Sequence, residues 1–209
     1  MSFVYIRVVV LELPYVVLKE LVERETMGGM VVVKLFFYHF FKEDLRSYHF
    51  MEKPSVYLET SFVSYLTAKP SRNLIVAAHQ SITSDWWENQ RQLFDLFISQ
   101  VVVDEAKLGD PQAAAKRLTA LEGITHLDVS EEIIIFAGYL IDFKAIPKNE
   151  LRDAYHLSVA CVHGINYLLT WNCKHLANAS IREKIEETST QFGYRIPIIC
   201  TPEELLGEF

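Results

Sequence analysis

Short apolar runs rich in β-branched residues alternate with helix-like stretches along most of this chain, and this alternation restricts the fold more than any other feature. The first run begins at residue 55 and the last ends at residue 200. A strand that is followed by a helix before the next strand begins usually pairs with that strand in parallel. We therefore predict an α/β fold, a three-layer α/β/α sandwich with a mostly parallel central sheet.

Caps, glycines and apolar spacing divide this pattern into expected elements. The predicted strands cover residues 55–58, 98–103, 124–129, 167–170 and 196–200. The predicted helices cover residues 62–68, 86–97, 110–123, 130–143, 149–164 and 180–192. Within the second helix, Trp86 and Trp87 are expected to place one ring in the core and leave the other half exposed, rather than to stack bases or fill a partner groove.

The first 50 residues do not join the pattern. Their apolar runs, residues 3–13 and 30–41, are interrupted by charges and are shorter than the ~20 residues of a membrane span. A secretory signal is not indicated either, because a basic start and a small-residue cleavage site are missing. We predict that residues 51–209 form the domain and that residues 1–50 are an extension, either a functional arm or a non-native product of a start codon assigned too early.

Charge and cysteine content narrow the class of protein. Lys and Arg number 20 against 27 Asp and Glu, which gives a net charge of -7 and no basic field for general nucleic-acid binding. An enzyme with divalent cations in an acidic site can still act on phosphates. Three widely spaced cysteines favour a reduced, cytoplasmic location over a disulfide framework or a zinc site.

The segment from residue 149 to residue 178 predicts a buried helix, a glycine that ends it, a buried strand and a polar turn. Asn149 can cap the helix and Gly164 can end it in a left-handed conformation. Asp153 is then a carboxylate in the first turns of an apolar helix, where desolvation is costly unless a cation or a set of hydrogen bonds meets it. Asn172 emerges just after the strand, where ligands collect in open α/β sheets.

Four polar side chains occupy comparable places in this repeated pattern. Glu59 follows the first predicted strand, Glu105 follows the second, Asp153 lies in the buried helix and Asn172 follows the fourth strand. Side chains that leave the carboxyl ends of neighbouring parallel strands converge. Carboxylates that converge without basic partners repel one another, and a hard cation such as Mg²⁺ or Mn²⁺ removes that penalty.

Each of these residues also has a purely structural interpretation. Glu59 can be a surface loop acid, Glu105 a first-turn helix acid, and Asp153 a partner of Arg152 or His156. His156 lies one turn beyond Asp153, so it either orients that carboxylate or is a core histidine with satisfied hydrogen bonds.

In order and spacing, four segments resemble the motifs of PIN-domain ribonucleases, and most closely those of VapC-type toxins of type II toxin-antitoxin systems. The segments are residues 57–61, 104–105, 153–156 and 169–175, and the resemblance covers residues 51–206. It implies a PIN-like fold and a Mg²⁺- or Mn²⁺-dependent endoribonuclease that hydrolyses phosphodiester bonds in RNA in the cytoplasm. It also implies a cognate antitoxin that covers the active site, and we expect a homodimer.

The resemblance assigns roles to residues of this chain. The catalytic positions are Glu59, Glu105, Asp153 and Asn172, of which the first three are the metal ligands and the last orients the attacking water. The supporting residues are Thr60, Ser61, His156 and Thr170. Lys174 and Arg152 are candidate phosphate contacts, although each can also be an ordinary surface charge.

Two positions depart from the pattern of that family. Asp is usual at the place of Glu59 and frequent at the place of Asn172. A longer carboxylate and a missing charge both weaken cation binding. A catalytically weakened or inactive PIN-fold module that binds RNA or protein is therefore the alternative, and a metal-dependent phosphatase or structure-specific DNA nuclease is a third.

Overall fold

The computed structural model describes residues 53–207. The predicted extension, residues 1–50, and the domain start at Met51 lie outside the described residues. The strands are β1 (Ser55–Leu58), β2 (Asp95–Ser99), β3 (Thr125–Leu127), β4 (Tyr167–Leu169) and β5 (Ile198–Cys200). The α-helices are α4 (Thr60–Thr67), α5 (Leu74–Asn89), α6 (Gln100–Ala106), α7 (Pro111–Ala120), α8 (Glu131–Asp142), α9 (Leu151–Val162) and α10 (Ala179–Gln191). Short 3₁₀ helices cover Arg91–Leu93 and Pro202–Leu205.

The sheet has five strands in the order β3-β2-β1-β4-β5, and every neighbouring pair is parallel. The chain runs outward from β1 to β3 on one side and then from β4 to β5 on the other. The strand order therefore reverses between β1 and β4, and in open parallel sheets the crevice beyond the carboxyl ends of such strands is the usual ligand site.

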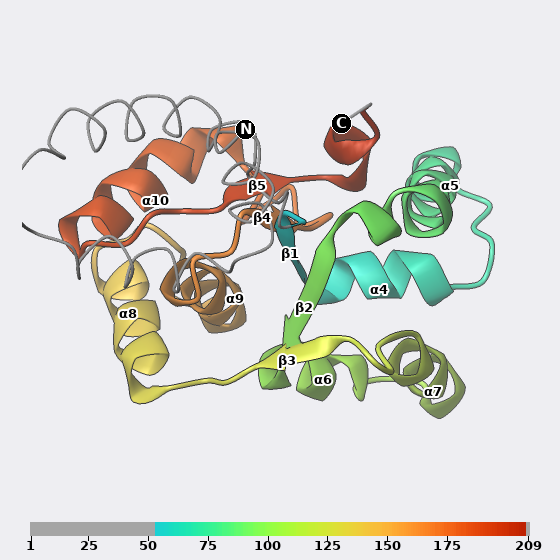
Figure 1. Cartoon of the computed structure of the whole chain (residues 1–209), viewed down its shortest axis with the longest axis horizontal. Helices are drawn as coiled ribbons and strands as arrows, with labels where there is room; N and C mark the ends of the chain where they lie inside the picture. The colour runs from blue at the N-terminus through green and yellow to red at the C-terminus, as the bar shows by residue number, and fades with distance from the viewer. Residues whose placement is uncertain (1–52, 208–209) are drawn as a thin grey trace, which may run out of the picture. The chain divides into compact units, whose positions relative to one another are not determined.

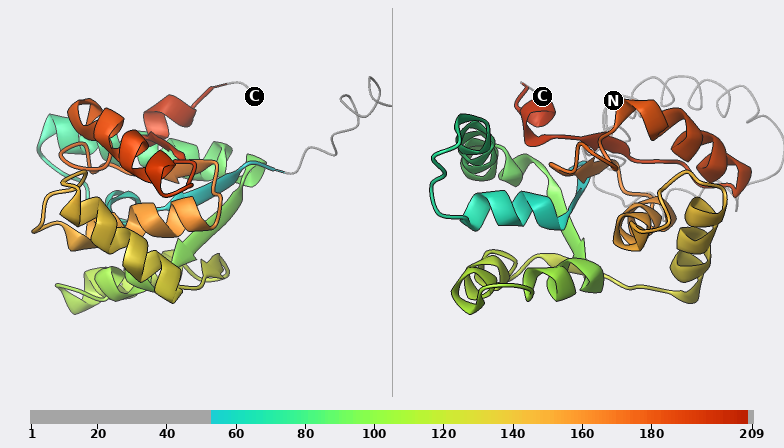
Figure 2. Two further views of the ribbon diagram at one scale, coloured as in Figure 1. Left: turned by 90° about the vertical axis from the view of Figure 1, so that its left-hand side faces the viewer. Right: turned by 180° about the vertical axis from the view of Figure 1, so that it is seen from behind.

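Helices cover both faces of the sheet. Figure 1 shows α8, α9 and α10 on one side of the sheet and α4, α5 and α7 on the other, and the reverse view in Figure 2 shows the same division. Val56, Tyr57 and Leu58 of the central strand are at most 1% exposed. A strand covered on both faces reads as a continuous apolar run, and the predicted α/β/α sandwich with a parallel sheet is confirmed.

Two predicted elements in the first half of the chain have wrong boundaries at both ends. The helix expected at residues 86–97 is α5, which begins at Leu74 because the Asn73 side chain accepts hydrogen bonds from the first free backbone N–H groups, and which ends at Asn89. The strand expected at residues 98–103 begins at Asp95 and ends at Ser99, and the residues from Gln100 onward belong to α6.

The run of β-branched residues caused the second error, because it crosses from a strand into a helix. Ile98 is buried in β2, whereas Val102 and Ala106 are buried four residues apart on one face of α6. A spacing of four is helical, so the tertiary burial of that face outweighs the β propensity of the valines.

Several local predictions are confirmed. Asp110 caps α7 by accepting a hydrogen bond from Ala113 N–H at 2.9 Å, and Pro111 is the first residue of that helix. Gly164, which follows α9, has φ +64°, a left-handed conformation that glycine adopts without strain. At the other end of α9 the residue in the capping position is Glu150, not Asn149, and its side chain makes no capping hydrogen bond.

The two adjacent tryptophans behave as expected from packing. Trp86 is 0% exposed and stacks on Phe94, with ring centroids 5.6 Å apart. Trp87 is half-buried, and the guanidinium of Arg91 lies 4.5 Å from its ring centroid. One ring therefore fills the core while the other forms a cation–π contact at the surface.

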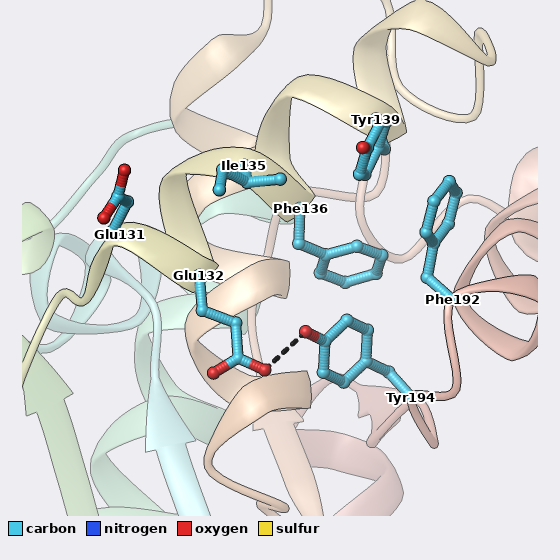
Figure 3. Close-up of a pocket in the computed structure, with 7 residues that line it drawn as sticks. All are labelled: Glu131, Glu132, Ile135, Phe136, Tyr139, Phe192 and Tyr194. Carbon is cyan, nitrogen blue, oxygen red and sulfur yellow. Dashed lines mark hydrogen bonds between the residues drawn. The ribbon is translucent and has the colours of Figure 1, made fainter.

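Aromatic side chains fill the contact between α8 and the end of α10. Tyr139 stacks on Phe192 with ring centroids 4.1 Å apart, and these rings help to line a pocket of about 260 Å³. Tyr194 donates a hydrogen bond of 2.6 Å to Glu132 at the edge of this pocket (Figure 3). Within residues 53–207, no helix has both the length and the apolar character needed to cross a membrane.

Candidate active site

Glu59 lies directly after β1, at the point where the strand order reverses. It is 5% exposed and is the N-cap of α4. Its Oε2 accepts hydrogen bonds from Ser61 N–H at 3.0 Å, from the Ser61 hydroxyl, and from Thr170 Oγ1 at 2.7 Å. Leu58 pairs with Leu169 in the sheet, so the next residues along the two strands, Glu59 and Thr170, meet side by side. Glu59 is therefore a buried carboxylate that hydrogen bonds fix in place at the carboxyl edge of the sheet, and it is not a surface loop acid.

Glu105 comes from a different element than the sequence predicted. It lies on α6 and not directly after a strand, because β2 ends six residues before it, at Ser99. Its Oε2 accepts hydrogen bonds from Thr60 Oγ1 at 2.5 Å and from His156 Nε2 at 2.8 Å. Its Oε1 lies 3.6 Å from Nη1 of Arg152. The helix thus brings Glu105 to the same edge of the sheet as Glu59.

His156 lies between these two carboxylates and is 0% exposed. Its Nε2 lies 2.8 Å from Glu105 Oε2 and 3.9 Å from Glu59 Oε1. Its Nδ1 lies 2.9 Å from the Tyr57 hydroxyl, which in turn lies 2.7 Å from Ser99 Oγ. Both ring nitrogens therefore have partners, and the ring orients Glu105, not Asp153.

The charges of this group are interdependent. Burial disfavours the imidazolium, but the hydrogen bond to Glu105 and the negative charges of Glu59, Glu105 and Asp153 raise the pKa of His156. Burial likewise disfavours the Glu105 carboxylate, but the contact with His156 and the hydrogen bond from Thr60 lower its pKa. Both shifts favour the charged pair, an imidazolium beside a carboxylate, in which His156 supplies positive charge inside the acidic group.

Asp153 is 7% exposed in the first turn of α9. Its Oδ2 accepts a hydrogen bond of 3.0 Å from Asn172 Nδ2. Burial raises the pKa of Asp153 to about 6; the charge of Glu59 adds to this rise and the hydrogen bond from Asn172 opposes it. Ionisation of Asp153 therefore destabilises the folded chain, and a bound cation would remove this destabilisation.

Asn172 has both ends of its amide engaged. Nδ2 donates to Asp153, and Oδ1 accepts a hydrogen bond of 3.1 Å from His175 N–H. In this arrangement the amide ties α9 to the loop after β4, and its oxygen is already in use. The predicted role of Asn172 toward an attacking water stays a prediction.

The two candidate phosphate contacts differ in position. Arg152 is 62% exposed in its side chain and pairs loosely with Glu105. Lys174 is exposed on the loop after β4, where its carbonyl accepts a hydrogen bond from Asn178. Both residues flank elements that carry the acids, and phosphate binding by either stays a prediction.

The acidic groups of the described residues form two sets that could hold a cation. The possible ligand atoms of Glu59, Glu105 and His156 lie within 4.8 Å of one another, but both ring nitrogens of His156 are hydrogen-bonded, so only the two carboxylates are free to bind an ion. The donor atoms of Glu150, Asp153 and His175 form a second such set. Carboxylate oxygens in this number fit Mg²⁺ or Mn²⁺. The structure thus brings Glu59 and Glu105 together, whereas Asp153 belongs to the adjoining set.

The comparisons with known proteins rest on structure. No protein-family model matches the chain, and no curated protein matches it. Three similar solved structures are VapC20 of Mycobacterium tuberculosis, described as a Sarcin-Ricin loop cleaving toxin, VapBC2 of Rickettsia felis bound to a DNA fragment from its promoter, and VapBC-1 of nontypeable Haemophilus influenzae. All three are VapC toxins or VapBC complexes.

The likeness to these structures is remote. VapC20 is 16% identical, with a TM-score of 0.41, over 55% of this chain and 87% of its own. VapBC2 is 17% identical, with a TM-score of 0.42, over 70% of this chain and 97% of its own. VapBC-1 is 14% identical, with a TM-score of 0.46, over 71% of this chain and 98% of its own. They are proteins of the kind that the sequence motifs resemble.

Some residues of the site were missed by reasoning from sequence. Tyr57 begins the first of the four motifs but was predicted only as a strand residue without a role in the site, and Ser99 lay inside a strand predicted with the wrong boundaries. Glu150 was not predicted as a ligand, and His175, although it ends the fourth motif, has no spacing typical of a zinc site. The polar end of a tyrosine in an otherwise apolar strand was the one available signal, because a buried hydroxyl needs a partner.

Proposed function

We propose that this chain is a divalent-metal-dependent endoribonuclease of the VapC type, the toxin of a toxin-antitoxin pair. One observation carries the proposal. Glu59 and Glu105 come from separate elements and lie against the buried His156, and Asp153 of α9 interacts electrostatically with both Glu59 and His156, beside the point where the strand order reverses. Such a concentration of buried carboxylates is costly for folding and is typical of a functional site.

The acids and their neighbours have distinct parts in this proposal. Glu59, Glu105 and Asp153 would hold Mg²⁺ or Mn²⁺, and such an ion supplies Lewis-acid polarisation of a phosphodiester and lowers the pKa of a water. Ser61 and Thr170 hold Glu59 in place by hydrogen bonds. Thr60 does the same for Glu105.

The charges around the site support the proposed RNA substrate and the proposed antitoxin. Arg152 and Lys174 would contact RNA phosphates at its margin. An antitoxin segment with basic side chains would bind to the acidic side chains and prevent the substrate from reaching them. We also propose that the chain acts in the cytoplasm and forms a homodimer. The net charge of -7 supports a basic partner.

A protein that has the fold but no catalysis is the second candidate. It is favoured by the contacts of Asn172, whose amide is occupied at both ends, and by Glu59, whose Oε2 caps α4 and accepts three hydrogen bonds. In that case the acids and His156 would form a structural network. The chain would then bind RNA or protein without cleaving phosphodiesters.

Cleavage of a mixed structured RNA by the full chain separates the two candidates. The reactions contain Mn²⁺ or EDTA, and the variants are Glu105→Gln and the adjacent Asp104→Asn, which is exposed and pairs with Lys107 outside the acidic group. The nuclease predicts metal-dependent cutting that Glu105→Gln abolishes and Asp104→Asn retains. If folded wild-type protein cuts no RNA with Mn²⁺, or if Glu105→Gln protein cuts as fast as wild type, the nuclease assignment fails.

A further inference from the structure

The pocket between α8 and the segment after α10 has a lining that suits an organic cation. Its volume is about 260 Å³. Aromatic rings and carboxylates make up most of the lining, and it includes no basic side chain of the described residues. The rings belong to Phe136, Tyr139, Phe192 and Tyr194, and the carboxylates to Glu131 and Glu132.

This pocket is separate from the candidate active site. His163, the C-cap of α9, has its Nε2 2.9 Å from the carbonyl oxygen of Asp128, just before α8 begins at Glu131. Asp153 lies in the first turn of α9, and a helix of 12 residues is about 18 Å long. The start of α8 therefore lies near the end of α9 that is remote from Asp153, and no residue that lines the pocket belongs to the acidic group.

The aromatic rings form one cluster that is open to solvent. Tyr139 stacks on Phe192 and is 38% exposed, whereas Phe136 is 1% exposed. The ring of Tyr194 lies with its centroid 4.4 Å from that of Phe136, and Figure 3 shows both rings beside Glu132. The faces of aromatic rings carry partial negative charge, so such a cluster attracts cations.

The two carboxylates keep free acceptor atoms. Glu132 Oε1 accepts the hydrogen bond from the Tyr194 hydroxyl, but its Oε2 has no hydrogen-bond or ion-pair partner among residues 53–207, and neither has the Glu131 carboxylate. Acids in the first turn of a helix interact favourably with the helix dipole, which accounts for their place in α8. It does not account for the exposed rings beside them.

A guanidinium group fits this lining better than other cations do. It is planar and stacks on aromatic rings, and its fork of N–H groups matches a carboxylate. The ammonium of lysine is a compact charge that water hydrates strongly. A phosphate group would be repelled by both acids, so the pocket does not suit RNA. The same chain already contains a contact of this kind, between the guanidinium of Arg91 and the ring of Trp87.

The surroundings of the pocket indicate that the cation belongs to a protein. Ile135 lines the pocket and is 50% exposed, and Phe143 is 44% exposed with its ring centroid 5.6 Å from that of Phe192. A free small cation would leave these apolar side chains in water, whereas a protein segment would cover them. The volume is also below the range of about 300–1,000 Å³ that is typical of pockets for drug-sized ligands.

We propose that this pocket binds an arginine side chain of a partner protein, and that apolar side chains next to this arginine cover Ile135 and Phe143. The net charge of -7 favours a partner with basic side chains. The proposal goes beyond the proposed function and does not depend on nuclease activity.

Titration of the isotope-labelled full chain with a blocked pentapeptide, Ala-Leu-Arg-Leu-Ala, followed by nuclear magnetic resonance, tests the proposal. The matched peptide has citrulline in place of arginine and so keeps the shape without the charge. We expect the arginine peptide to shift amide resonances of α8 and residues 192–194, and the citrulline peptide to bind at least ~5-fold more weakly. Methylguanidinium alone should also bind more weakly than the arginine peptide.

Two variants test the lining of the pocket. Glu132→Gln removes a charge but keeps an oxygen for the Tyr194 hydroxyl, and Tyr139→Ala removes an exposed ring. Each should weaken binding of the arginine peptide at least ~5-fold. Glu183→Gln is the control, because Glu183 is an exposed acid of α10 that does not line the pocket, and it should bind this peptide as wild type does.

Several outcomes would overturn the proposal. They are an arginine peptide that does not bind or binds no better than the citrulline peptide, and wild-type affinity in both Glu132→Gln and Tyr139→Ala. Methylguanidinium that binds as tightly as the arginine peptide would instead assign the pocket to a small cation. If wild type sediments as a dimer that Tyr139→Ala dissociates, a second copy of this chain covers the pocket, and the proposed partner is wrong.

Discussion

His156 Nε2 lies 2.8 Å from Glu105 Oε2, which places a buried imidazole inside an acidic group whose negative charges favour its protonated form. A cation at this point offsets the repulsion among carboxylates that would otherwise oppose folding. The protein thus carries its own counter-charge at the place where a metal ion is proposed to bind. The stability of the metal-free chain should depend on this contact.

We expect His156→Gln to lower the free energy of unfolding in EDTA by about 2 kcal/mol, less than for a fully buried ion pair because Glu105 is part-exposed. The amide cannot replace both the charge and the contact with Tyr57. Added Mg²⁺ should raise the melting temperature of this variant more than that of wild type, because the carboxylates then lack their counter-charge. Thermal unfolding with and without Mg²⁺ measures both effects.

His163→Gln is the control for loss of a histidine, because His163 is the exposed C-cap of the same helix, and this variant should match wild type in both conditions. Equal stabilisation of His156→Gln and wild type by Mg²⁺ would show that the imidazolium does not compensate the acids.

The ionisation of Asp153 should make stability depend on pH. Burial raises its pKa from 3.8 to about 6, so the folded chain binds a proton that the unfolded chain has already released. The free energy of unfolding should therefore fall as the pH rises from about 4 to about 6, and the loss should persist above pH 6. Urea unfolding at several pH values in EDTA measures this dependence.

Asp153→Asn should remove that part of the pH dependence and make the metal-free chain more stable than wild type at pH 7.5. The new amide can still accept the hydrogen bond from Asn172 through its oxygen. A variant that is less stable than wild type at pH 7.5, with the same slope between pH 4 and pH 6, would contradict this account.

The fold could be predicted from sequence because the alternation of short strands and helices is a local pattern with few solutions. Features that depend on neighbouring residues were located within a few positions. They are the third and fourth strands, the helix cap at Asp110 and the helix end at Gly164. The boundary at Ser99 failed because the valines after it favour strand locally, while burial of Val102 and Ala106 on one helix face decides the structure.

The sequence could predict where several residues of the candidate site lie, but not the contacts that they make. Glu59 was placed correctly because it directly follows a strand. The partners of His156 could not be inferred, because Glu105 reaches it from α6 and Tyr57 from β1, and sequence spacing does not specify such long-range contacts. The same holds for Asn172, whose two partners lie on α9 and on its own loop.

The Tyr57 hydroxyl should contribute to stability through its contacts with Ser99 and His156. Tyr57→Phe leaves Ser99 Oγ and His156 Nδ1 in a buried place without this partner, so we expect a loss of about 1–3 kcal/mol in the free energy of unfolding. Tyr194→Phe is the control, because its hydroxyl binds Glu132 at an exposed position, and it should cost less than ~0.5 kcal/mol. Urea unfolding of both variants decides the point, and similar losses would mean that the buried network adds little.

Asn172→Asp should destabilise the metal-free chain but strengthen the binding of a metal ion. The new carboxylate would lie where Asn172 Nδ2 now donates to Asp153 Oδ2 at 3.0 Å, so the metal-free chain should become less stable by about 1–3 kcal/mol. With Mn²⁺, the added negative charge should tighten ion binding, because affinity for hard cations rises with the number of charged oxygen ligands. Calorimetric titration with Mn²⁺ measures the affinity, and RNA cleavage by the same preparation then separates the two candidate functions.

Faster cleavage than wild type would identify a nuclease that its asparagine weakens. Tighter Mn²⁺ binding without cleavage in either protein would identify a binding module in which the acids have a structural role.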